Sequence, residues 1–200
     1  LIQKVKFNLL TEFQFWKWFT ENKEMIEKFI ISKFDDYTPY EELKDKLREY
    51  HQGVIPELTI DMANNFVLIL SCDGIREGII PVEKLFESAP IINKWVIQKF
   101  RQPGNHIDLN FKGLDFKAKD IKAKYFLNEK VIDIELYIKG YKESDSRYKS
   151  LAFLYLDHLV GEYITMTKIG TITFKKLPFF GNTSEMKTLQ ELGELTKSIK

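Results

Sequence analysis

One cysteine and three histidines are the residues of this sequence that could support nucleophilic chemistry. Cys72 follows the apolar run Phe66–Leu70 and precedes Asp73 and Gly74, which read as a turn. A cysteine nucleophile needs a base within hydrogen-bond reach and a lowered thiol pKa. His158 is the candidate base, but no spacing in the sequence brings it near Cys72. Burial as a small apolar residue is therefore the favoured interpretation of Cys72, and a hydrolase or transferase site around it is the alternative.

Metal-binding and phosphate-binding motifs are poorly supported. The histidines, His51, His106 and His158, show no ligand spacing. His158 and Glu162 lie four residues apart, so they would share one face of a helix, but two ligands are too few for a site. The glycines are dispersed and form no dinucleotide-binding loop, P-loop or nucleophile elbow. We therefore predict no catalytic residues, no cofactor and no metal.

A series of lysines is the best candidate for contact with nucleic acid. Lys117, Lys119, Lys122 and Lys124 are predicted to form one outward stripe on a strand, with aromatic residues beside it. Phosphates of a nucleic-acid strand could follow such a stripe. A solvated strand face is the favoured interpretation, because the stripe contains no arginine and the chain is nearly neutral. Weak nucleic-acid binding through Lys117–Lys124 stays open as an alternative.

Aromatic residues are concentrated between Phe13 and Phe19, on more than one side of a predicted helix. A helix that is apolar on several faces is either enclosed by the fold or presents a patch to a partner. Burial in the core is the simpler interpretation. If the helix does contact another protein, Trp16 and Trp18 are the candidate partner-binding residues.

The elements that would position these side chains follow from the periodicity of the apolar residues. Residues 1–53 are predicted to be helical. Residues 54–180 are predicted to form the sheet, with a short strand expected at Tyr163–Met166, and residues 184–199 to form a C-terminal helix. Phe66–Arg101 and Val131–Phe174 both contain a strand, a helix and a return strand, without a residue-level repeat.

These elements predict an α+β fold in a single globular domain over residues 1–200. We expect a largely antiparallel or mixed sheet of about seven to eight strands, with helices packed mainly on one face. The only sub-boundary that the composition indicates lies near Gly53, at the end of the helical segment.

Composition excludes several classes of partner. Thirty basic and 29 acidic residues leave a net charge of +1, so no overall field favours nucleic acid or anionic lipid. The longest apolar run is far shorter than the roughly 20 residues that cross a bilayer. We see no secretory signal, and a single cysteine fits a reducing compartment. The prediction is a cytoplasmic protein without a membrane partner, whose oligomeric state the sequence does not indicate.

Four short motifs support a resemblance: Phe15-Trp16-x-Trp18-Phe19, Ser71-x-Asp73-Gly74, Ala89-Pro90 followed by Trp95, and Leu156-Asp157-x-Leu159-x-Gly161-Glu162. Together they make the chain similar to a group of uncharacterised bacterial proteins of about this length. The resemblance implies a single bacterial domain, and it carries over no activity and no catalytic residues. Some small neutral bacterial proteins act as partners or antidotes in toxin loci, which is an analogy of class only. Our leading hypothesis is a non-enzymatic intracellular binding or interaction protein.

Overall fold

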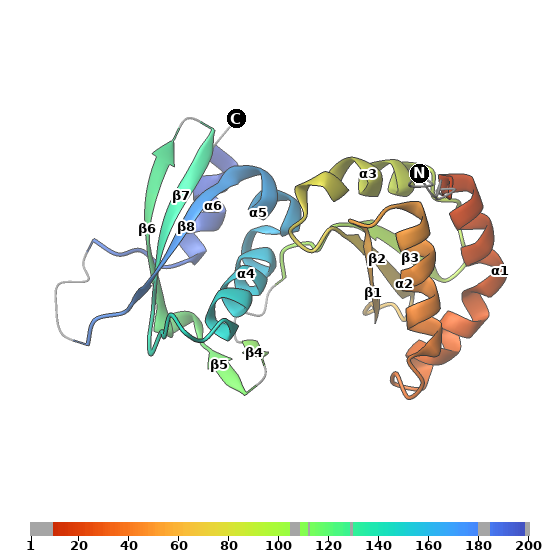
Figure 1. The fold of residues 1–200 in the computed structure, drawn as a ribbon, viewed down its shortest axis with the longest axis horizontal. Helices are drawn as coiled ribbons and strands as arrows, with labels where there is room; N and C mark the ends of the chain where they lie inside the picture. Colours follow the sequence, from red (N-terminus) through yellow and green to blue (C-terminus); the bar gives the residue numbers. More distant parts are fainter. Residues whose placement is uncertain (1–9, 105–108, 112, 129, 180–184, 199–200) are drawn as a thin grey trace, which may run out of the picture. The chain divides into compact units, whose positions relative to one another are not determined.

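The computed structural model describes residues 10–104, 109–111, 113–128, 130–179 and 185–198. Contacts within the chain divide it into two compact units, Leu1–Arg101 and Gln102–Lys200, and each unit is described by itself (Figure 1). The division falls after Arg101 and not near Gly53. A single domain over residues 1–200 stays a prediction.

Two helices begin the first unit, α1 (Glu12–Ile31) and α2 (Thr38–Tyr50). α1 starts at a capping box, in which the Thr11 hydroxyl accepts from the Gln14 N–H and the Gln14 side chain accepts from the Thr11 N–H. The Leu10 N–H donates to the Glu49 carbonyl, so the start of α1 is attached to the end of α2. The predicted helical N-terminal segment is confirmed for the described residues.

The sheet of the first unit has three strands, with β2 in the middle. β1 pairs with β2 in antiparallel register, whereas β2 and β3 are parallel, so the chain must cross over between them. A short 3₁₀ turn, η1, and helix α3 make this crossover. The bounds are β1 (Ile55–Ile60), β2 (Phe66–Ser71), η1 (Arg76–Gly78), α3 (Ile79–Glu87) and β3 (Trp95–Lys99).

Aromatic packing joins α1 to this sheet. The ring of Phe19 on α1 meets the ring of Trp95 on β3 edge-on, with centroids 4.9 Å apart. Phe66 on β2 lies 5.3 Å from the same indole. The Trp95 indole N–H donates to the Glu27 carboxylate at 2.8 Å, so this polar atom is satisfied inside the unit. These contacts fix one face of α1 against the strands.

The second unit also contains a three-stranded sheet made of a hairpin, a helical crossover and a parallel strand. β6 and β7 are antiparallel, and β7 and β8 are parallel. The inner face of this sheet packs on α4 and α6, because Ile132, Ile134 and Leu136 share a core with Leu156 and Leu192. The bounds are β4 (Leu109–Phe111), β5 (Leu114–Phe116), η2 (Ala118–Asp120), β6 (Ile121–Asn128), β7 (Val131–Ile138), α4 (Arg147–Val160), α5 (Glu162–Lys168), β8 (Ile169–Lys176) and α6 (Gln190–Ser198).

The α+β class is confirmed, but the single large sheet is wrong. The described strands form two three-stranded sheets and a separate pair, β4 and β5. The physical reason is that each helical crossover places the next strand beside the strand that precedes the crossover. β3 therefore pairs with β2, and β8 pairs with β7, so each sheet consists of strands that are close in sequence. The strand expected at Tyr163–Met166 is also wrong, because those residues lie in α5.

Candidate protein-binding pocket on helix α1

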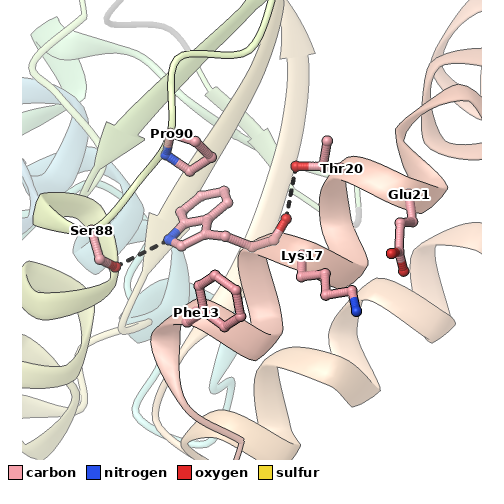
Figure 2. A pocket seen from close by; sticks show the side chains of 7 residues that line it. Phe13, Lys17, Thr20, Glu21, Ser88 and Pro90 are labelled. Atoms are coloured by element: carbon pink, nitrogen blue, oxygen red, sulfur yellow. Dashed lines mark hydrogen bonds between the residues drawn. The ribbon is translucent and has the colours of Figure 1, made fainter.

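A pocket of about 480 Å³ lies between α1 and the segment that follows α3. Figure 2 shows its labelled side chains, which come from three successive turns of α1 and from the chain after α3. The lining is mostly apolar, as in sites that take an apolar side chain. It consists of Phe13, Trp16, Lys17, Thr20, Glu21, Ser88 and Pro90.

Trp16 is the buried member of this lining, with 3% of its surface exposed. Its indole N–H donates to the Leu85 carbonyl at 2.9 Å and lies 3.2 Å from the Ser88 hydroxyl oxygen. Its ring meets Phe15 and Phe19 edge-on at 5.0 and 5.6 Å. Trp16 therefore attaches α1 to the end of α3 and closes the base of the pocket.

The hydrogen-bond donors of the other neutral lining residues are also used within the protein. The Thr20 hydroxyl donates to the Trp16 carbonyl at 2.8 Å, and the Ser88 hydroxyl donates to the Leu85 carbonyl at 3.0 Å. Ser88 also ends α3, where its N–H donates to the Lys84 carbonyl. A molecule that entered the pocket would therefore meet apolar surface and few available neutral donors.

Exposed residues form the rim. Phe13 is 76% exposed although it is large and apolar, and Ile91, next to Pro90, is fully exposed. Lys17 and Glu21 are exposed on the same helix, one turn apart. Across the residues that the structure describes, neither of these two charges is within ion-pair distance of an opposite charge. The rim therefore combines an apolar side chain with two charges of opposite sign.

The two tryptophans that the sequence singled out occupy different environments. Trp16 is buried and lines the pocket, and Trp18 is half-buried with its ring 6.4 Å from that of Phe15. Partner contact by Trp16 and Trp18 stays a prediction. Sequence reasoning did not assign Phe13, Ser88 or Pro90 to the site. Phe13 belongs to the aromatic run and Pro90 to the motif Ala89-Pro90, and these were the only sequence signals for this part of the site.

Cys72 is enclosed at the end of β2, with none of its surface exposed. Gly78 is so close that an added Cβ would lie 3.1 Å from the Cys72 sulfur and 2.2 Å from the Gly53 carbonyl oxygen. His158, the candidate base, is an exposed residue of α4 in the second unit. An enclosed thiol favours the interpretation of Cys72 as a packing residue over that of a nucleophile.

The proposed sharing of a helix face by His158 and Glu162 is wrong. α4 ends at Val160, and Gly161 has a φ of 88°, a conformation that glycine adopts without strain. Glu162 then begins α5 and is fully buried, whereas His158 is exposed. Within the described part of the chain, no group of three or more histidine, cysteine, aspartate or glutamate residues could hold a metal ion.

The continuous lysine stripe is also wrong. Lys122 and Lys124 do alternate with the inward residues of β6, but Lys117 precedes that strand and Lys119 lies in η2. Lys124 pairs with Glu185 at 3.1 Å, and the hydrogen bond from this pair raises the pKa of Lys124. Acidic neighbours on the same face therefore reduce the positive charge that a phosphate backbone would meet.

Glu135 on β7 is the second acidic neighbour of these lysines. It lies opposite Lys124 in the sheet register and binds Lys175. Hydrogen bonds from Lys175 and Tyr137 lower the pKa of Glu135, so its carboxylate stays charged. The outer face of the sheet is thus a mixed-charge, solvated surface.

Two general findings complete the description of the site. Within the described residues, none of the helices combines the length and the apolar character that crossing a membrane would require. Comparison of the chain with protein-family models, with curated proteins and with solved structures found no match. The resemblance to bacterial proteins of similar length stays a prediction, and a function must be argued from the geometry of the chain itself.

Proposed function

We propose that this protein is a non-enzymatic binding protein whose α1 pocket receives an apolar side chain of a protein partner. The observation that carries the proposal is an apolar pocket of about 480 Å³ beside a large apolar residue, Phe13, that the fold leaves exposed. Burying such surface against a partner is the usual source of association energy.

The polar atoms of the pocket support an apolar occupant. The Trp16 N–H and the Thr20 and Ser88 hydroxyls already donate inside the unit. A polar ligand would lose its bonds to water without finding these donors, which is unfavourable. An apolar side chain loses no such bonds, and aromatic pockets of this kind are typical of the positions that dominate the energy of a protein interface.

The experiment is a selection of peptides on the full chain, followed by measurement of their affinity for two variants. A phage-displayed library of random peptides of about 16 residues, long enough to form a helix on binding, is selected on the wild-type protein. The Phe13→Ala variant is the test, because this side chain is exposed and belongs to the rim. Met62→Ala is the matched control, because Met62 is a fully exposed apolar residue outside the pocket.

The expected result is enrichment of peptides with an aromatic or leucine side chain whose affinity falls about tenfold or more for Phe13→Ala. The same peptides should bind Met62→Ala as they bind the wild type. Peptides that bind Phe13→Ala with unchanged affinity would place recognition elsewhere and overturn the proposal. A selection that enriches no peptide would overturn it as well.

A further inference from the structure

Resting on this proposed function, we infer that the segment received by the pocket is an amphipathic helix. In this partner helix, an apolar residue, the anchor, enters the pocket. An acidic residue one helical turn from the anchor contacts Lys17, and a basic residue two turns from the anchor contacts Glu21. Phe13, Lys17 and Glu21 are four residues apart on α1, so they follow one line along the helix at intervals of about 6 Å.

The backbone around the pocket offers no strand edge with which an extended peptide could pair. From Gln14 onward, the N–H groups of α1 are used in its own helix and capping box, and on the other wall the Ser88 and Ala89 N–H groups donate to Lys84 and Phe86 carbonyls. Pro90 has no N–H. An extended peptide would leave its backbone groups without partners here, whereas a helix satisfies them internally. The occupant is therefore a helix.

The two rim charges also favour a helical partner of defined charge order. Lys17 precedes Glu21 by four residues, and lysine before glutamate is the weaker order for an ion pair within a helix. Consistent with this, the two side chains form no ion pair with each other in the structure. Both charges are available to a partner, and their order, apolar then positive then negative, selects a helix with the complementary order.

The test uses synthetic helical peptides of about 16 residues with one leucine anchor. The matched peptide carries glutamate one turn and lysine two turns from the anchor, and it is made in both chain directions. The swapped peptide exchanges the two charges. Each is titrated against the wild type, against the Lys17→Glu/Glu21→Lys double variant and against Phe13→Ala, with circular dichroism to confirm that the variants fold. Titration with L-phenylalanine tests a small zwitterionic ligand in place of a helix.

The wild type should prefer the matched peptide about threefold to tenfold, because two exposed ion pairs contribute modestly. The double variant should lose the preference for the matched peptide, because glutamate four residues before lysine is the favoured order for an ion pair within α1. Phe13→Ala should bind both peptides weakly. Equal binding of both peptides, still dependent on Phe13, would overturn this inference and leave the proposed function intact. Binding of L-phenylalanine that depends on Lys17 and Glu21, with no peptide binding, would replace the helix by a small ligand.

Discussion

At the scale of single residues, the described part of the chain has no buried side-chain nitrogen or oxygen atom without a hydrogen-bond partner. Tyr50 at the end of α2 is an example, because its hydroxyl lies 3.0 Å from the Glu12 carboxylate and 3.1 Å from the Pro81 carbonyl. One tyrosine thus connects α1, α2 and the start of α3. Burial, followed by the hydrogen bond to Glu12, raises the pKa of Tyr50 well above its usual value of 10.0.

The raised pKa of Tyr50 predicts how stability depends on pH. In the unfolded chain the tyrosine loses its proton near pH 10, while in the folded protein it stays neutral, so its contribution is present below pH 10 and is lost as the pH rises. Tyr50→Phe should lower the free energy of unfolding by about 1 kcal/mol at neutral pH. Above pH 10 the stability of the variant should fall less steeply than that of the wild type.

Urea denaturation across this pH range checks the Tyr50 prediction. Other tyrosines with raised pKa values, such as Tyr40 and Tyr125, remain in both proteins and cancel in the comparison. If the free energy of unfolding fell equally steeply with pH in both proteins above pH 10, the raised pKa of Tyr50 would not contribute to stability and the prediction would be wrong.

At the scale of elements, both units contain the same arrangement, a hairpin followed by a crossover helix and a parallel strand. In each unit a pocket lies between the end of the first crossover helix, α3 or α4, and a helix that is not part of the hairpin, the crossover or the parallel strand. In the first unit that helix is α1. In the second it is α6, and the pocket of about 350 Å³ includes Leu159, Val160, Gln190 and Thr196. The topology therefore recurs, while the chemistry of the pocket differs.

The parallel pairing in the second unit contains an irregularity that the first lacks. The register of β7 with β8 shifts between Ile132 and Ile134. There the Asp133 carboxylate accepts from the Thr171 N–H at 2.7 Å, and an added Cβ on Gly170 would lie 2.3 Å from the same carboxylate oxygen. Glycine at 170 thus leaves room for the Asp133 carboxylate, which an alanine side chain would displace.

This contact predicts the outcome of a double-mutant cycle. Gly170→Ala should displace the Asp133 carboxylate and lower the free energy of unfolding by about 1 kcal/mol, the value of one such hydrogen bond. In an Asp133→Ala background the same substitution should cost less, because the obstructing oxygen is gone. Chemical denaturation of the four proteins measures the coupling. Strictly additive effects would mean that the carboxylate does not determine the need for glycine.

At the scale of the whole molecule, each unit has its own sheet and its own buried residues. This predicts that each unit opens separately. Gly78→Ala forces a Cβ against the Gly53 carbonyl at 2.2 Å, so it should reduce hydrogen-exchange protection of β1, β2 and β3 and leave that of β6, β7 and β8 unchanged.

Ile134→Ala, which removes a core side chain of β7, should give the reverse pattern at a cost of about 2–5 kcal/mol. Amide exchange measured on the full chain with both variants resolves the strands. Simultaneous loss of protection in all six strands would instead support one cooperative domain over the chain, as the sequence predicted.

Most of the local elements can be predicted from the sequence, because the signals for them lie within a few residues of each other. The alternation of Ile132, Ile134, Leu136 and Ile138 predicts a strand with one buried face, and the structure confirms it. Gly161 directly follows α4, and glycine at this place is a common local signal for the end of a helix. The helix after it was missed, because the seven residues of α5 are too few for helical periodicity to be recognised and include β-branched residues.

Only the tertiary structure decided how the strands divide into separate sheets and which aromatic residues of α1 remain exposed. Strand partners and the faces of a helix depend on contacts between residues far apart in the chain, such as Trp16 with Leu85 across 69 positions. From the sequence, Trp16 was a candidate partner-binding residue, whereas Phe13 was only the first residue of the same aromatic run. The contact with α3 buries Trp16 and leaves Phe13 at the rim, and that difference forms the pocket.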